Sequence, residues 1–184
     1  MPNRTEALQL MQEWTANESL RKHMLCVETA MCAYAEKFGE NAERWSIAGL
    51  LHDFDYERYP EPPDHPLKGN EVLASLGYDE EIRTAILGHA HYTNVPRSSR
   101  MAKALFACDE LCGFIVACSL VKPDKKVSSV EVSSVRKKMK DKGFARNVSR
   151  EDIVDGAKEL EVELDEHIRF VLDALKKNAE SLGL

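Results

Sequence analysis

Residues 17–39 read NESLRKHMLCVETAMCAYAEKFG and carry the signals of one long amphipathic α-helix. Asn17 is a suitable N-cap, and Gly39 can end the helix in the left-handed conformation that glycine adopts without strain. Between them, an apolar stripe follows the three- and four-residue spacing of a helix face and includes a histidine. The stripe consists of Leu20, His23, Val27, Ala30 and Tyr34. We therefore predict a helix that runs to about Phe38, with the His23 side chain pointing into the core.

The chain after this helix repeats the same kind of signals. Asn41 is a suitable cap for a helix that runs towards His52, and Asp79 is a suitable cap for another that ends near Gly88. Between these helices, residues 54–66 contain four prolines, which exclude a regular helix interior and predict a loop. No stretch shows the sustained alternation and β-branched enrichment of a strand. The sequence therefore predicts an all-α fold.

Further helices are predicted along the rest of the chain. One lies between Pro66 and Gly77, and the apolar run ALFACDELCGFIVACSL at 104–120 predicts a buried one, because it is too short for a bilayer and contains two acids. The later, polar part includes VRKKMKDK at 135–142, which we interpret as a solvated helix face. A capping-box spacing at Ser149 precedes two amphipathic helices. His167 lies in the acid-rich second one and is expected on the surface.

Length and composition favour one globular domain. The chain has 184 residues, enough to bury a single core, and no linker-like tract interrupts it. Its formal net charge of −6 argues against a nucleic-acid polymer as partner, since such binding needs many basic residues against phosphates. The N-terminus lacks the pattern of a secretory signal, and five cysteines without a paired framework indicate reduced thiols. We expect a cytoplasmic protein with no membrane partner.

Histidines and aspartates are grouped in a way that points to a metal site. Five of the six histidines fall between residues 23 and 91, and one forms the His52-Asp53 doublet at the end of a predicted helix. Asp109 interrupts the apolar run, where an unpaired buried carboxylate would cost several kcal/mol and so needs a cation. Two imidazoles and two carboxylates suit a divalent transition metal, and they do not choose among Fe, Mn, Co, Zn and Ni.

These residues resemble the ligand pattern of the HD superfamily of metal-dependent phosphohydrolases, whose order is H…HD…D. The resemblance covers residues from about 18 to 120 and rests on LRKHMLCVETA, WSIAGLLHDFD and KALFACDEL. It implies one HD-type helical bundle over residues 1–184, with additional C-terminal helices from about 123 to 184. It also implies one or two divalent metal ions. The first set of ligands would be His23, His52, Asp53 and Asp109.

Some members of the HD superfamily bind a second metal through histidines between the doublet and the last aspartate. His65 in HPLKG resembles the HPxxG segment of those members, and His89 or His91 in ILGHAHY lies where another ligand is expected. The resemblance then makes Asp53 the ligand that bridges the two metals. Members that act on cyclic dinucleotides typically show HDxGK and a later GYP, and neither occurs here. That activity is therefore not expected.

The resemblance implies hydrolysis of a phosphomonoester or phosphodiester in a nucleotide or a related small metabolite. A bound divalent cation lowers the pKa of a coordinated water and so supplies a hydroxide nucleophile, which Asp53 would orient. The candidates for holding the phosphate are three basic residues next to the predicted ligands, Arg21, Lys22 and Lys68. Two alternatives stay open: an HD-fold di-iron oxygenase, and a non-catalytic regulatory or ligand-binding protein that keeps a metal.

Overall fold

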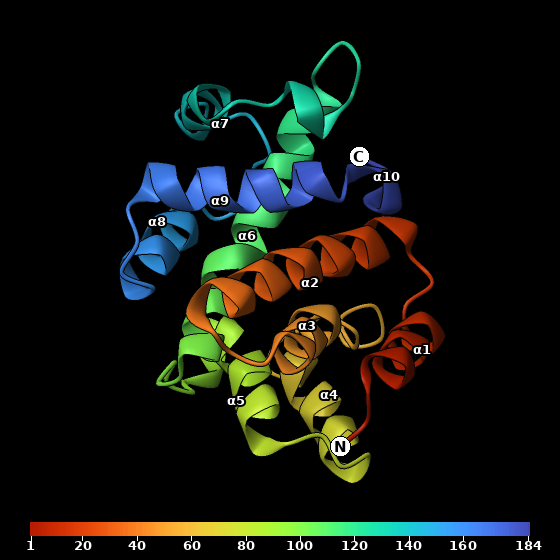
Figure 1. Cartoon of the computed structure of the whole chain (residues 1–184). Coiled ribbons are helices and arrows are strands. Elements are labelled where there is room, and N and C mark those ends of the chain that lie inside the picture. The colour runs from red at the N-terminus through yellow and green to blue at the C-terminus, as the bar shows by residue number, and fades with distance from the viewer. The chain divides into compact units, whose positions relative to one another are not determined.

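The computed structural model describes residues 1–184 and contains helices but no strands, which confirms the predicted all-α class. Figure 1 shows its elements. In chain order they are α1 (Arg4–Trp14), α2 (Glu18–Phe38), α3 (Ala42–Leu51), α4 (Asp64–Ser75), α5 (Glu80–His89), η1 (His91–Thr93), α6 (Arg100–Leu120), η2 (Val127–Ser129), α7 (Val132–Met139), α8 (Arg150–Glu159), α9 (Leu164–Lys177) and α10 (Ala179–Leu182).

The chain divides into two compact units, residues 1–105 and 106–184. The division falls inside α6, the predicted apolar helix, and no break in composition marks it in the sequence. None of the helices combines the length and the apolar character that crossing a bilayer requires. All five cysteines are free thiols in this structure.

The predicted caps of the first unit are present. The Asn17 side chain accepts a hydrogen bond from the backbone N–H three residues later, and Gly39 ends α2 at a φ of 70°. Asn41 and Asp79 cap α3 and α5 through the same side-chain contact. These contacts satisfy backbone donors that a helix start leaves unpaired. The three predicted helices therefore begin and end within one or two residues of the expected positions.

α3 is the central helix of the first unit. Every residue from Trp45 to Leu51 is buried, and α3 contacts α1, α2 and α5. In Figure 1 it lies alongside α2, which it approaches closely at Gly49. A Cβ atom at Gly49 would lie 2.8 Å from the backbone N and Cα of Glu28. Only a glycine therefore allows α2 and α3 to pack at this distance.

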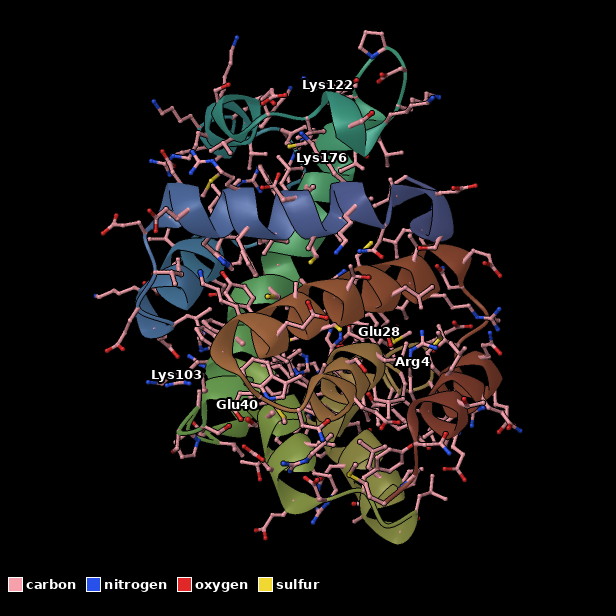
Figure 2. The ribbon with its side chains drawn as sticks, in the orientation of Figure 1. Arg4, Glu28, Glu40, Lys103, Lys122 and Lys176 are labelled. Atoms are coloured by element: carbon pink, nitrogen blue, oxygen red, sulfur yellow. The ribbon has the colours of Figure 1, made fainter.

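An ion pair joins α1 to α2 at the same level. Arg4 Nε lies 2.5 Å from Glu28 Oε1, and a second guanidinium nitrogen lies 3.0 Å from Oε2. The Glu28 side chain is only 8% exposed, and a carboxylate at that depth needs a cation. Figure 2 labels both residues. The pair holds α1 against the part of α2 that Gly49 approaches.

The proline-rich segment after α3 is the predicted loop, and it is tied to the α1–α2 junction. Thr15 Oγ1 donates to the carbonyl oxygen of Phe54 at 3.1 Å, and Glu57 accepts from two backbone N–H groups that precede α2. α4 begins at Asp64, three residues before the predicted start after Pro66. However, His65 and Pro66 inside it have non-helical backbone angles, so regular helix resumes after Pro66 as predicted.

In the second unit, α9 contacts η2, α7, α8 and α10. The prediction that His167 lies on the surface is wrong, because its side chain is fully buried and Nε2 lies 2.7 Å from the carbonyl oxygen of Ala107. His167 falls one turn before Val171 on the apolar face of α9, while the neighbouring acids Asp165 and Glu166 are exposed. The helical period, and not the acidic composition of the segment, determines where this histidine lies.

Candidate metal centre

Asp53 lies among four histidines that come from α2, α3, α4 and α5. Its Oδ2 atom is 3.3 Å from Nε2 of His52 and 3.7 Å from Nε2 of His23. Its Oδ1 atom is 3.3 Å from Nε2 of His65 and 3.4 Å from Nε2 of His89. Each oxygen of one carboxylate thus faces its own pair of imidazoles.

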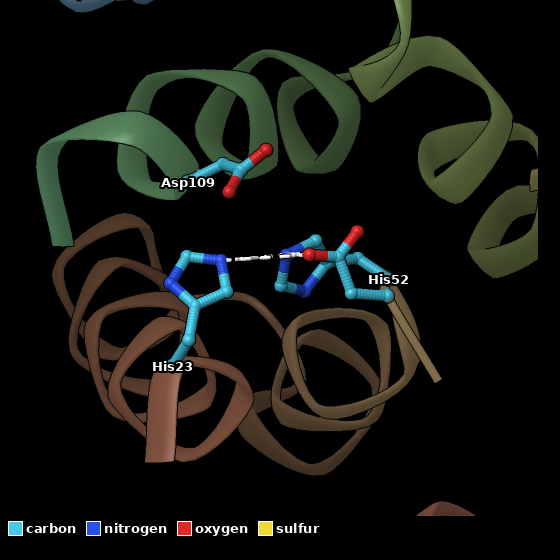
Figure 3. Close-up of side chains that lie close together, drawn as sticks. His23, His52 and Asp109 are labelled. Carbon is cyan, nitrogen blue, oxygen red and sulfur yellow. Dashed lines mark hydrogen bonds and ion pairs between the residues drawn. The ribbon is translucent and has the colours of Figure 1, made fainter. Parts of the chain in front are cut away.

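The two imidazoles of each pair also face each other. Nε2 of His23 and Nε2 of His52 are 3.1 Å apart, and Nε2 of His65 and Nε2 of His89 are 3.3 Å apart. Figure 3 shows His23 on α2 and His52 at the end of α3 pointing towards one another. Two nitrogens at this distance are compatible only if a proton or a cation lies between their lone pairs.

In His52, His65 and His89, the other ring nitrogen lies against a hydrogen-bond acceptor. Nδ1 of His52 lies 2.8 Å from the backbone carbonyl oxygen three residues earlier, and Nδ1 of His89 makes the same contact in its own helix. Nδ1 of His65 lies 2.7 Å from Oδ1 of Asp55. Carbonyl and carboxylate oxygens only accept, so each Nδ1 carries a proton, and each ring presents a lone pair at Nε2 when Nε2 carries no second proton.

This donor set fits a metal ion at each pair. Lone pairs from imidazoles and a carboxylate converge on one space, and mixed nitrogen and oxygen donors suit divalent transition metals. The Nδ1 contacts are those by which proteins orient metal-binding histidines. Two sets of residues could each hold an ion, and both contain Asp53: one has His23 and His52, and the other has His65 and His89.

Asp109 and His91, two other predicted ligands, differ in their surroundings. Asp109 lies one helical turn beyond residue 105 on the continuous helix α6. With His23, His52 and Asp53 it forms a group of residues that could hold a metal ion. His91 is exposed in η1 and belongs to neither group.

The electrostatics of the centre are dominated by Asp53. Burial alone would raise the pKa of Asp53, but its contacts with His52, His65 and His89 outweigh burial and hold that pKa well below its usual value. Burial lowers the pKa of His65, whereas Asp53 and Asp55 raise it by more, to about 9. Without a cation, the His65 ring therefore carries a second proton, on Nε2, at neutral pH. A metal ion that binds at Nε2 would displace that proton.

Asp55 is a residue of this centre that the sequence analysis did not single out. It is 1% exposed, and while its Oδ1 accepts from His65, its Oδ2 accepts from the backbone N–H of Gly69 at 2.7 Å. A Cβ atom at Gly69 would lie 2.7 Å from the Asp55 carboxylate, so glycine is required there too. Two features of the sequence could have indicated this role: an aspartate two residues after the His52-Asp53 doublet and a glycine four residues after His65.

Two of the three predicted phosphate-binding residues, Arg21 and Lys68, contact other groups of the protein. Arg21 donates to the backbone carbonyl oxygens of Gln12, in the last turn of α1, and of Thr15, which directly follows α1. Lys68 lies 3.5 Å from both carboxylate oxygens of Glu71. Lys22 is partly buried on α2. Their role in holding a phosphate stays a prediction.

One family model matches this chain. The model of the HD domain matches residues 20–113, which is just over half of the chain and includes all four residues of the H…HD…D pattern. The chain belongs to the HD domain family. HD domains bind divalent metals and are generally metal-dependent hydrolases of the phosphohydrolase superfamily. No curated protein and no solved structure matched the chain.

Proposed function

We propose that this HD protein is a metal-dependent phosphohydrolase that cleaves a phosphomonoester or phosphodiester in a nucleotide or related small metabolite. The observation that carries the proposal is the position of Asp53, whose two oxygens face two pairs of imidazoles. One carboxylate that belongs to two ligand sets would suit a pair of metal ions, the arrangement that many enzymes use to clamp phosphate esters.

In this proposal, His23 and His52 would hold one ion and His65 and His89 a second, and Asp53 belongs to both sets of ligands. Asp109 completes the first set, as the family pattern implies. The divalent ions would neutralise charge on the phosphate oxygens and activate a water molecule. The cation could be Fe, Mn, Co, Zn or Ni.

The protein side chains would orient the reaction. Asp53 would accept a hydrogen bond from the attacking water, while the Nδ1–H groups of His52, His65 and His89 donate to their acceptors and so fix the rings. His23 and Asp53 are the more open members of the centre, with side chains 21% and 16% exposed. A small phosphate ester would therefore approach from their side.

The experiment is a test for phosphate release by the intact chain. The purified protein is stripped of metal, reloaded separately with each of the five cations, and assayed against a panel of phosphomonoesters and phosphodiesters. Asp53→Ala should lower the rate by a factor on the order of 100 or more, because the ligand shared by both sets is lost. Asp64→Ala, which removes an exposed carboxylate at the start of α4, should leave the rate unchanged.

Two outcomes would count against a hydrolase. Metal-loaded protein that releases no phosphate from any member of the panel would contradict the proposal directly. Oxygen consumption together with a di-iron absorption band would instead support the oxygenase alternative.

A further inference from the structure

A basic groove lies between α7 and α9 in the second unit, and no residue of the metal centre lines it. It has a volume of about 540 Å³, within the usual range for small-molecule sites. Four of its lining side chains are cationic, and they are joined by one acid and one hydroxyl. They are Arg136, Lys137, Lys140, Arg169, Asp165 and Ser133.

The charge of this groove is opposite to that of the whole chain. Four cations and one acid give the lining an excess of positive charge, while the chain has a formal net charge of −6. Most of these cations come from VRKKMKDK, the run that the sequence analysis interprets as a solvated face. Arg136, Lys137 and Lys140 are exposed, as a solvated face requires, and α9 adds Arg169 to the same groove from a different part of the chain.

The positive charges are only partly compensated within the protein. Arg136 Nε lies 3.0 Å from Asp165 Oδ1, but Lys137, Lys140 and Arg169 form no ion pair. On α7, Arg136 and Lys140 are four residues apart and Lys137 and Lys140 are three apart, spacings at which like charges repel. The groove therefore gathers cations at a cost that a bound anion would remove.

We infer that this groove binds a compact anion with two or more phosphate groups. Arg136 and Arg169 offer planar donor pairs that match phosphate oxygens, the two lysines add mobile charge, and Ser133 adds a neutral donor. A nucleic-acid polymer is disfavoured, because it needs a long basic track and the chain as a whole is acidic. The inference does not depend on the proposed hydrolase activity.

The test is calorimetric titration of the intact chain with inorganic tripolyphosphate, without added divalent cation. We expect binding of one molecule per chain. Arg136→Ala and Arg169→Ala should each weaken it about tenfold, since each removes a charge-assisted contact. Lys177→Ala is the matched control: it removes one positive charge from an exposed position of α9 outside the groove, and it should change the affinity less than about twofold.

A second variant gives a result that misfolding cannot imitate. Asp165→Asn removes the negative charge of the groove and releases Arg136, so it should tighten binding severalfold. Asp173→Asn, at another exposed acid of α9, should have a smaller effect.

Three outcomes would overturn the inference. The first is no binding of tripolyphosphate, and the second is equal losses in the groove variants and in Lys177→Ala. The third is tighter binding of a single-stranded oligonucleotide, with a salt dependence that reports many phosphate contacts, because the site would then serve a polymer.

Discussion

Asp55 accepts two hydrogen bonds with two oxygens, and an asparagine at this position could accept with only one. Asp55→Asn would leave either Nδ1 of His65 or the N–H of Gly69 without its acceptor. Because such contacts orient a metal-binding histidine, we predict that the ion held by His65 and His89 binds about 10–100 times more weakly. Titration of metal-free protein with a cation, followed by calorimetry, measures this change.

Asp64→Asn is the control for this prediction, since it removes one carboxylate charge from an exposed position in the same segment. It should leave both affinities unchanged. The site that contains His23 and His52 should also keep its affinity in Asp55→Asn, since Asp55 contacts neither ring. Equal weakening at both sites would mean that Asp55 supports the fold as a whole.

Variants of His89 and His91 test the assignment of the second metal site more sharply, because the sequence alone left open which of the two binds a metal. His89→Ala removes a ring whose Nε2 lies 3.4 Å from Asp53, whereas His91→Ala removes an exposed one. We predict that His89→Ala lowers the metal content of the purified protein by up to one ion per chain and that His91→Ala does not. Elemental analysis of the two variants beside the parent protein decides between them. Loss of metal in His91→Ala alone would reverse the assignment.

At the scale of elements, the distance between α2 and α3 depends on Gly49. An alanine there would put its Cβ 2.8 Å from the Glu28 backbone, so the helices must separate. We predict that Gly49→Ala lowers the free energy of unfolding by about 1–3 kcal/mol, the range for overpacking. It should also weaken metal binding, since His23 and His52 lie on the separated helices. Denaturant unfolding with and without metal gives both values.

Gly143→Ala is the matched control for Gly49→Ala. A Cβ at Gly143 would meet its nearest neighbour, an Asp141 side-chain oxygen, at 3.4 Å, which is ordinary contact. This variant should therefore keep both its stability and its metal affinity. A stable Gly49→Ala protein with normal metal binding would show that the two helices can rearrange without disturbing the imidazoles.

The helices could be predicted from sequence because their signals are local. The caps at Asn17, Asn41 and Asp79 and the stripe that carries His23 lie within a few residues of what they determine. The contacts of Asp55 with His65 and Gly69 could not be found in this way, because they join positions 10 and 14 residues apart across a loop. The roles of these residues follow from packing and not from a pattern.

At the scale of the whole molecule, average properties concealed two features. The continuous apolar run of α6 gives no sign that the chain divides at residue 105, because a helix crosses that point without a break. The net charge of −6 likewise hides the four cations gathered between α7 and α9, since acids elsewhere outnumber them. A sum over the sequence cannot report where charges of one sign gather, which depends on the packing of α7 against α9.

The cysteines offer a measure of how firmly the entire chain is folded. Cys32 is partly exposed, whereas Cys26, Cys108, Cys112 and Cys118 are buried. Burial raises the pKa of Cys26 to about 12 and that of Cys118 to about 11, so their reactive thiolates are scarce at pH 8. We predict that a disulfide reagent at this pH modifies one thiol rapidly in the native protein and all five in denaturant. Cys32→Ser should abolish the rapid phase. Rapid modification of two or more thiols would mean that buried helices open before global unfolding.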